Sequence, residues 1–273
     1  MLVKQNSLFT MFFMKVIIVG LTLLILSGCS AANKNSVTPE IQTEIEASEE
    51  GDDFGDEFDD EFAEKEVFDP LSGYNRFMTS FNDKFYTYIM DPVARGYRYV
   101  VHEEVRDSVG KFFHNLLYPL RLINNLLQFK FKNAMEETGR FLVNSTVGLF
   151  GLFDPAKKYL DWKPHNEDFG QTLGFYGVGS GFHIVLPFLG PSNLRDMFSL
   201  YPDAEASPLY YRSKRSYNLA KSNLESLGYV SWEKLNFVSL HIGEYEDLKE
   251  DAVDLYPFLR DIYEQYREKQ IKE

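Results

Sequence analysis

Apolar residues recur at three- and four-residue intervals between Tyr74 and Ile89. The positions are Tyr74, Phe77, Met78, Phe81, Phe85, Tyr88 and Ile89. Such spacing places side chains on one face of an α-helix. Similar stripes recur at residues 105–117, 122–127, 134–145, 210–227 and 255–266, whereas no run alternates between apolar and polar residues over the length of a convincing strand. The pattern predicts an all-α body folded as one domain.

Turn and cap residues give the expected helix boundaries. Asp91-Pro92 is expected to end the first helix and to cap the next, because proline is favoured in the first turn and not in a helix interior. Pro119 is expected to close the second helix. Ser192 is expected to cap a short helix that runs through Phe198.

The N-terminus has the pattern of a targeting sequence. Lys15 precedes an apolar run over residues 16–26, which has the length of a signal-peptide core and is short of the roughly 20 residues that cross a bilayer. Leu26-Ser27-Gly28-Cys29 then resembles a lipobox, in which small residues precede a cysteine that receives acyl chains. We predict a signal peptide over residues 1–28, with Met14 as an alternative start, and a lipid anchor on Cys29. The alternative is a buried free cysteine after an ordinary N-terminal helix.

Residues 29–67 are expected to form an acidic, flexible tether. Residues 40–66 hold 14 acidic residues and one lysine, a composition typical of a solvated, self-repelling segment. The alternative is a short acidic amphipathic helix, because Phe54, Phe58 and Phe62 recur every four residues. The net charge of −13 belongs to this segment, and the chain from Val67 onward is close to neutral at −3. The folded body therefore has no basic surface of the kind that binds nucleic acid.

The high content of apolar and aromatic residues in the predicted helices has two explanations. Aromatic residues make up 16% of the chain, and several predicted helices have wide aromatic faces. These faces either form an ordinary globular core or lie in a membrane interface, where Tyr and Phe are favoured. No segment after Cys29 is long and apolar enough to span a bilayer.

Enzyme functions fit the sequence poorly. Ser180 lies in Val178-Gly179-Ser180-Gly181-Phe182, which lacks the outer glycines of a hydrolase nucleophile elbow. His165 and Asp168 are three residues apart but have no second pair of metal-binding residues nearby. The sequence therefore predicts a protein that is not an enzyme and that has no metal or other cofactor.

Short motifs follow one another in a fixed order along the helical body. They include Asp69-Pro70-Leu71, Asn75-Arg76, Asn144-Ser145-Thr146, Gly151-Leu152-Phe153-Asp154-Pro155, Glu167-Asp168-Phe169-Gly170-Gln171-Thr172-Leu173-Gly174, Leu186-Pro187 and Arg195-Asp196. Together with the lipobox, this set resembles the MlaA/VacJ lipoproteins. The resemblance is close over residues 68–203 and returns loosely at residues 260–267. Residues 204–251 match poorly, and His102, His183 and Ser199 stand where the family commonly has Pro, an aromatic residue and Gly.

The resemblance implies a ring-like domain of amphipathic helices over residues 68–270, lying in the inner leaflet of the outer membrane on its periplasmic side. It implies a lipoprotein that removes mislocalised glycerophospholipid from the outer leaflet through an amphipathic channel and so maintains lipid asymmetry. The implied partners are phospholipid, a trimeric porin, a soluble periplasmic lipid carrier and an inner-membrane ABC transporter complex. The alternative is a passive envelope scaffold that tethers porins.

The candidate channel residues lie mainly in a glycine-rich segment near residues 169–190. Glycines permit close backbone approach, and neutral polar side chains offer hydrogen bonds to a headgroup without trapping it. The alternative is a tight loop packed on a core, with satisfied buried polar groups. The candidates are Asn144, Thr146, Gly170, Gln171, Thr172, Gly174, Tyr176, Gly177, Gly179 and Pro187.

Overall fold

The structure is a computed structural model that describes residues 68–211 and 218–273. The predicted signal peptide, the anchor Cys29 and the acidic tether over residues 29–67 lie outside the described residues. The described residues belong to one compact unit. Its elements are α3 (Ser72–Phe85), η1 (Tyr86–Met90), α4 (Asp91–Val100), α5 (Glu103–Leu116), α6 (Tyr118–Leu127), α7 (Phe131–Thr146), α8 (Pro155–Leu160), α9 (Phe169–Phe175), β1 (His183–Leu186), β2 (Gly190–Asn193), α10 (Leu194–Ala206), α11 (Asn223–Leu240), α12 (Glu244–Glu250) and α13 (Leu255–Lys272).

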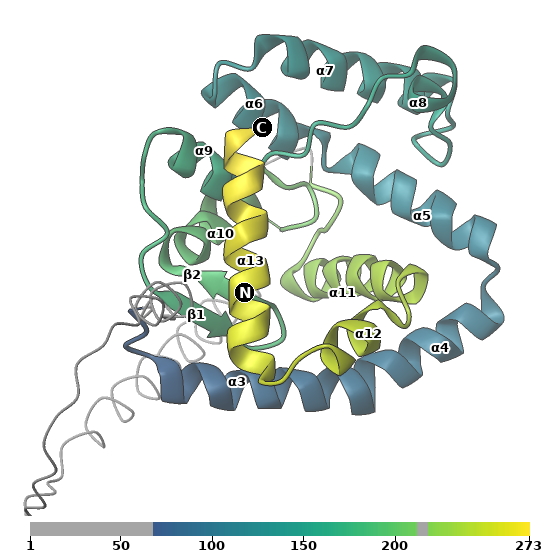
Figure 1. Ribbon diagram of the computed structural model, residues 1–273. Helices are drawn as coiled ribbons and strands as arrows, with labels where there is room; N and C mark the ends of the chain where they lie inside the picture. The colour runs from purple at the N-terminus through teal and green to yellow at the C-terminus, as the bar shows by residue number, and fades with distance from the viewer. Residues whose placement is uncertain (1–67, 212–217) are drawn as a thin grey trace, which may run out of the picture. The chain divides into compact units, whose positions relative to one another are not determined.

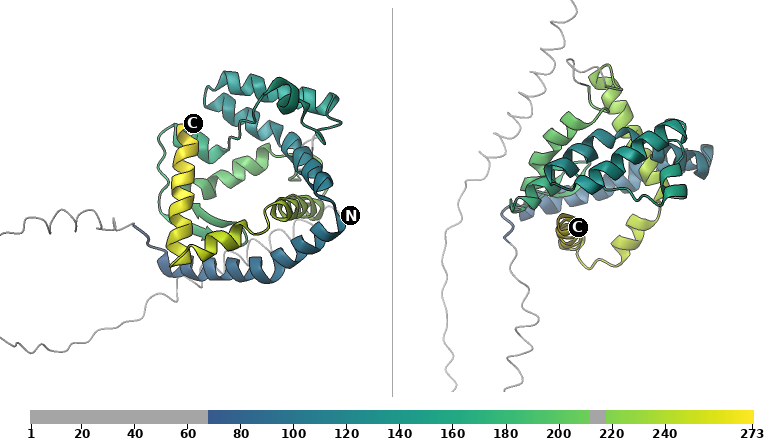
Figure 2. Two further views of the ribbon diagram at one scale, coloured as in Figure 1. Left: turned by 45° about the vertical axis from the view of Figure 1, so that its right-hand side comes forward. Right: turned by 90° about the horizontal axis from the view of Figure 1, so that it is seen from above.

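The helices of this unit follow one another around a ring (Figure 1). In that view α3 and α4 form one side, α5 the next, the paired helices α6 and α7 the third, and α9, α10 and the two strands the fourth. Helix α11 packs on α4 and α5, and Figure 2 shows this arrangement from a second direction. Helix α13 packs on α9, β2 and α3. The prediction of a ring-like helical domain is confirmed.

Helices α3 and α4 are joined by the π-helical turn η1 into one rod. The prediction that Asp91-Pro92 ends the helix was wrong, because Asp91 donates its backbone N–H to the carbonyl of Tyr86 and the helix continues. A π turn inserts an extra residue into a helix. Here it directly precedes Pro92, whose ring and missing N–H disturb a regular i→i−4 ladder. The rod bends at this point instead of stopping (Figure 1).

Other helix boundaries are set by side-chain caps. The cap of α10 is Asn193, whose side chain accepts from the backbone N–H of Asp196, so the prediction of Ser192 was wrong by one residue. Helix α11 begins later than predicted because Ser222 caps it by accepting from the N–H of Glu225. Helix α7 and the C-terminal helix α13 lie where the apolar spacing predicts them.

The two short strands form an antiparallel hairpin that the sequence did not predict. Strand β1 pairs with β2 from His183 opposite Asn193 to Leu186 opposite Gly190. Asn75 of α3 holds β1, donating to the carbonyl of His183 at 3.0 Å and accepting from the N–H of Val185 at 2.9 Å. The α3 side chain therefore replaces the neighbouring strand that a two-stranded sheet lacks.

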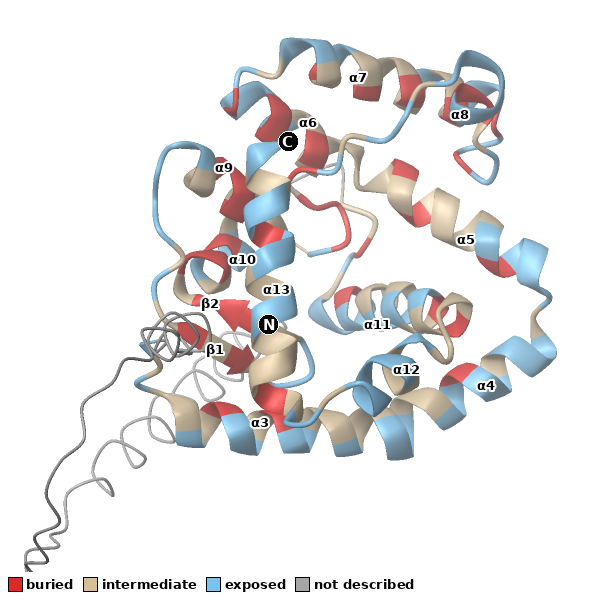
Figure 3. Ribbon diagram, viewed as in Figure 1, coloured by how far each residue is buried: buried red, intermediate tan, exposed pale blue. Residues whose placement is uncertain are grey.

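The largest fully buried side chains of this protein are mostly polar, and many large apolar side chains are exposed. This inverted burial is the reverse of an ordinary globular core, in which the largest buried side chains are apolar. Large apolar side chains are exposed on most of the helices. Figure 3 colours all exposed positions pale blue. None of the described helices combines the length and apolar character that crossing a membrane requires. The largest side chains that are fully buried are Gln128, Glu137, Val185, Asn75, Asn124, Asn125, Asn193, Asn236 and Ser239.

Candidate lipid-binding cavity

A largely apolar cavity of about 640 Å³ lies between the rod, the hairpin turn and helices α11, α12 and α13. This volume is within the range of about 300–1,000 Å³ that is usual for small-molecule sites. A few polar groups, among them Asn82, Ser231 and Lys234, interrupt the apolar wall. The apolar and aromatic lining residues are Phe85, Tyr86, Met90, Val185, Phe188, Leu189, Pro191, Leu227, Val230, Phe237, Val238, Tyr245 and Leu259.

Helix α11 supplies one wall of the cavity from a single face. Its lining residues recur at three- and four-residue intervals, which is the period of one helical face. Buried polar residues on the other face, Asn236 and Ser239, fix the helix to α5. Asn236 donates to the carbonyl of Arg106 at 2.9 Å, and Arg106 donates to Ser239. The lining residues of α11 are Leu227, Val230, Ser231, Lys234, Phe237 and Val238.

The hairpin turn forms another part of the wall. Asn82 of α3 donates to the carbonyl of Leu186 at 2.9 Å and accepts from the N–H of Phe188 at 2.8 Å. Phe188 has a positive φ of 64°, which is unfavourable for a bulky residue. Its ring contacts those of Phe81 and Phe85 edge-on, at centroid distances of 5.3 and 4.8 Å. Asn82 and the rings together hold this conformation and place an apolar side chain beside the cavity.

Two phenols close the side of the cavity nearest α12. The rings of Tyr86 and Tyr245 lie 4.4 Å apart. Burial, together with the charge of Glu246, raises the pKa of Tyr86 to about 12. Tyr245 donates to Asp83 at 3.0 Å, and Lys249 pairs with Asp83 at 2.7 Å. Both phenols are therefore neutral donors at physiological pH, and Asp83 is already paired.

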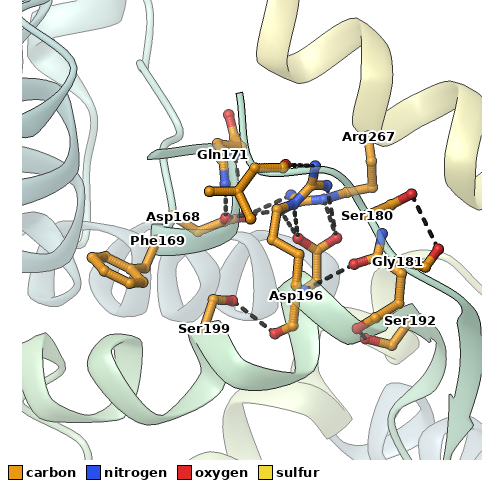
Figure 4. A network of polar contacts seen from close by, with 12 residues as sticks. Asp168, Phe169, Gln171, Ser180, Gly181, Ser192, Asp196, Ser199 and Arg267 are labelled. Atoms are coloured by element: carbon orange, nitrogen blue, oxygen red, sulfur yellow. Dashed lines mark hydrogen bonds and ion pairs between the residues drawn. The ribbon is translucent and has the colours of Figure 1, made fainter. Parts of the chain in front are cut away.

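Three of the predicted channel residues lie in a buried polar network next to α13, separate from the cavity. Asp168 caps α9 by accepting from the N–H of Gln171 at 2.8 Å (Figure 4). The Gln171 side chain donates to the same carboxylate at 3.1 Å. Thr172 donates to Asn124 at 2.9 Å. Gly170 lies against Asp196 and Arg267, with no room for a side chain.

Two further predicted residues are packed within the protein. Asn144 of α7 donates to Asp154 at 3.0 Å and accepts from the N–H of Ala156 at 3.1 Å, so it fixes the start of α8. A side chain at Gly174 would collide with Ile271, which means that this glycine lets α9 approach α13.

The remaining predicted residues are exposed. Tyr176 donates its hydroxyl to the carbonyl of Leu127 at 2.6 Å, and Thr146 bonds back to its own helix. Side chains at Gly177 and Gly179 would meet open space, and Pro187 precedes the hairpin turn. None of the ten candidates is among the residues that line the cavity. Their role in a channel stays a prediction.

The glycine-rich segment offers a matched stability test. A methyl group at Gly170 would lie 2.3 Å from Asp196 Oδ1 and 2.6 Å from Arg267 Nη2, within a fixed charge cluster. Overpacking of this kind costs about 1–3 kcal/mol, and we expect Gly170→Ala to lower the thermal unfolding midpoint. Gly179→Ala places its methyl group in open space and should leave the midpoint unchanged. Circular dichroism of both variants in detergent measures the difference, and equal midpoints would contradict the packing described here.

The sequence did not indicate most of the residues that line the cavity, and these come mainly from α11, η1 and the hairpin turn. Leu227 and Val230 fall in the part of the chain that matches the family poorly. The apolar spacing also predicts their helix over residues 210–227, whereas α11 spans Asn223–Leu240. The apolar stripe of Phe85 was recognised, but its spacing fits a buried core as well as a cavity wall. The one available indication was Lys234, a charged residue on a largely apolar helical stripe.

An exposed apolar loop lies between α7 and α8, away from the cavity. Leu149 and Phe150 both have positive φ, at 51° and 60°, and both side chains are exposed. Asn115 supports the loop, since its side chain donates to Ser145 at 3.0 Å and lies against Gly151, whose φ is 90°. A strained, supported backbone that presents apolar side chains outward indicates a surface for an apolar partner or a bilayer.

Ser180 and His165, the residues considered for enzyme chemistry, each have a hydrogen-bond partner within the protein. The Ser180 hydroxyl donates to the carbonyl of Gly181, and the His165 ring bonds to Glu136 at 2.7 Å. Arg195 and Asp196 form a buried pair at 3.0 Å, within the network of Figure 4.

Residues 67–270 match the sequence model of the MlaA lipoprotein family. An uncharacterized protein of Rickettsia felis is 32% identical over 210 residues, covering 76% of this chain and 79% of that protein. The intermembrane phospholipid transport system lipoprotein MlaA of Escherichia coli K12 is 39% identical over 133 residues, covering 47% of this chain and 52% of that protein. A solved structure described as the structural basis for maintenance of bacterial outer membrane lipid asymmetry superposes with a TM-score of 0.63 and 29% identity, covering 74% of this chain and 98% of that one. The chain belongs to the MlaA lipoprotein family.

Proposed function

We propose that this protein is a lipid-anchored outer-membrane lipoprotein that moves glycerophospholipid from the outer leaflet toward the periplasm and thereby maintains lipid asymmetry. The single observation that carries the proposal is the apolar cavity of about 640 Å³ with polar groups in its wall. A glycerophospholipid has apolar chains and a polar headgroup, and this cavity offers surface for both. The names of the Escherichia coli relative and of the matched structure support the same role.

The inverted burial of the body supports a membrane location. Exposed apolar residues such as Tyr99, Phe150 and Val178 lie on different elements, and exposed apolar surface of this extent favours an interface with lipid or protein. Buried polar side chains bond within the protein, as Asn75 does to the carbonyl of His183 and Asn144 does to Asp154. Such a body can lie in a membrane interface while its backbone hydrogen bonds stay internal.

The anchor and the partners belong to the same proposal. Acyl chains on Cys29 would hold the body at the periplasmic side of the outer membrane, and the acidic tether over residues 29–67 would separate anchor and body. A trimeric porin is proposed as the membrane partner. A soluble periplasmic carrier, serving an inner-membrane ABC transporter complex, is proposed to receive the lipid. The transport names of the relatives favour a function that is not enzymatic.

The first test is the phospholipid content of the outer leaflet in cells that lack the gene. Added phospholipase reaches only lipid exposed at the cell surface, so its products report that content. We expect the products to rise on deletion and to return to the parental level when the intact gene is restored. No rise on deletion would contradict lipid removal and leave an envelope scaffold that tethers porins as the better account.

Removal of the anchor gives a separate prediction. Cys29→Ala deletes the site of the predicted acyl chains, and stable membrane anchoring requires two lipid-type signals. We expect the variant to appear in the soluble periplasmic fraction or in the wrong membrane, as detected by fractionation and immunoblotting. Ser30→Ala is the control and should fractionate like the wild type. Normal outer-membrane fractionation of Cys29→Ala would mean that the helical body anchors itself.

A further inference from the structure

One charged side chain interrupts the apolar wall of the cavity. Lys234 lies on the cavity face of α11, between Val230 and Phe237, and it is the one charged residue among the described residues that line the cavity. A lysine on an apolar helical stripe has an energetic cost unless its ammonium group reaches water or a partner. Because the side chain is 56% exposed, its ammonium group stays in water and is available to an anionic group at the cavity.

The ion pairing around Lys234 leaves its charge available. Its one ion pair in the described part of the chain is with Glu233, at 3.3 Å, and the lysine side chain is 56% exposed. Glu233 is the adjacent residue on the helix, and its side chain is 21% exposed. Because the lysine is exposed to water, this pair is screened and leaves the ammonium group open to a second partner. Asp83, which is not a lining residue but accepts a hydrogen bond from the lining residue Tyr245, is already bound by Lys249 as well.

The surroundings of Lys234 decide which anion fits. Ser231 lies one turn away on the same face, so the cavity wall offers a hydroxyl and an ammonium group side by side. Leu227, Val230 and Phe237 extend the same face as apolar surface. Lysine is a common partner of phosphate as a compact positive charge. A small free anion would leave this apolar surface bare, whereas a lipid phosphodiester with its acyl chains covers it.

We propose that Lys234, assisted by Ser231, binds the phosphodiester of glycerophospholipid in the cavity while the acyl chains lie against Leu227, Val230 and Phe237. This inference rests on the proposed function and names the chemical group by which the cavity recognises its substrate. The phosphodiester is common to zwitterionic and anionic phospholipids. The site therefore distinguishes both from apolar lipids that lack phosphate, such as diacylglycerol.

The test is photo-cross-linking of lipid within the full-length protein. A benzophenone amino acid replaces Phe237, and the purified protein in lipid nanodiscs is irradiated with radiolabelled phosphatidylethanolamine, phosphatidylglycerol or diacylglycerol. Lys234→Met keeps the length of the side chain and removes its charge. We expect it to lower cross-linking of both phospholipids about tenfold, equivalent to about 1.4 kcal/mol, and to leave diacylglycerol unchanged. Lys234→Arg should restore phospholipid labelling, and Lys132→Met, on the exposed face of α7, should behave as the wild type.

Each of the other possible results of the cross-linking experiment would reject one particular claim. Unchanged phospholipid labelling in Lys234→Met would overturn the role of Lys234 and leave the proposed function standing. Equal losses for phospholipid and diacylglycerol would assign Lys234 to the packing of the wall, not to recognition. Competition by excess inorganic phosphate alone would indicate a free-anion site and overturn the inference. Absence of any lipid labelling in the wild type would reject the cavity as the lipid path and the proposed function with it.

Discussion

Cells whose only copy of this protein carries Val230→Trp are expected to accumulate surface phospholipid to the level of the deletion strain. Val230 lies in the middle of the cavity face of α11, and an indole ring at this position would project into the space that the acyl chains are proposed to occupy. Filling a well-packed core costs about 1–3 kcal/mol, but this site is open, so the fold should accept the ring. The variant should therefore fold, reach the membrane and fail to transport.

The measurement combines phospholipase accessibility at the cell surface with an immunoblot of the outer-membrane fraction. Val253→Trp is the matched control, because it makes the same replacement at a fully exposed position in the connection before α13. It should keep surface phospholipid at the parental level. Normal lipid asymmetry in Val230→Trp cells with normal protein levels would show that lipid takes another route.

The helical faces could be predicted from spacing, but their surroundings could not. The stripe that includes Phe81 and Phe85 was predicted correctly as one helix face. Spacing alone does not tell whether such a face meets a core, a membrane or a cavity. Phe85 lines the cavity, while Phe77 on the same helix is exposed. The difference arises from the hairpin turn and α11, which meet α3 only in the folded chain.

The hairpin and the continuation through Pro92 show where local rules fail. The strands have four residues each and are held by Asn75 and Asn82, which precede them by more than 100 positions in sequence. No local alternation could reveal them, because their partners are not local. At Pro92 the local rule predicted a helix end, but a π turn before the proline let the chain continue as one rod. At the hairpin tertiary contacts outweigh local preference, whereas at Pro92 the π turn changes the local hydrogen-bond pattern.

The role of the candidate channel residues stays a prediction, and their surroundings could not be predicted from composition for a related reason. Gly170, Gln171 and Thr172 have the composition of a polar path, and composition does not distinguish a path from a satisfied buried network. The partner that decides between them is Arg267, which lies 99 residues after Asp168 in the chain. The ordered motifs therefore identified the family correctly, whereas their polar residues mostly serve the packing of α9, α10 and α13.

Arg267→Met is expected to destabilise the folded protein by about 3–5 kcal/mol, the usual cost of leaving buried charges without their partner. The Arg267 guanidinium is nearly buried and bonds both carboxylates, to Asp168 at 2.7 and 2.9 Å and to Asp196 at 2.8 and 3.1 Å. Figure 4 shows the arginine between them, reaching from α13 to the starts of α9 and α10. Among the described residues, its removal would leave Asp168 without a cationic partner and Asp196 with Arg195 as its one cationic partner.

The pH dependence separates this charge effect from a loss of packing. Burial opposes ionisation of Asp168 and Asp196, but the hydrogen bonds and charge of Arg267 outweigh it and hold the pKa of each carboxyl below its usual range. A depressed folded-state pKa contributes stability at neutral pH that is lost as the pH falls through that pKa. The difference between the wild type and Arg267→Met should therefore be largest near pH 7 and shrink toward about pH 4, where the freed carboxyls can take up protons.

Denaturant unfolding of the detergent-solubilised protein at several pH values measures this difference. Lys269→Met is the control, because Lys269 lies two residues away on the same helix with an exposed side chain and should change stability by less than about 0.5 kcal/mol. A pH-independent loss in Arg267→Met would assign the effect to packing of the side-chain stem. No loss at pH 7 would mean that α9, α10 and α13 do not depend on the shared ion pairs, and that the packing of Gly174 against Ile271 suffices to join α9 to α13.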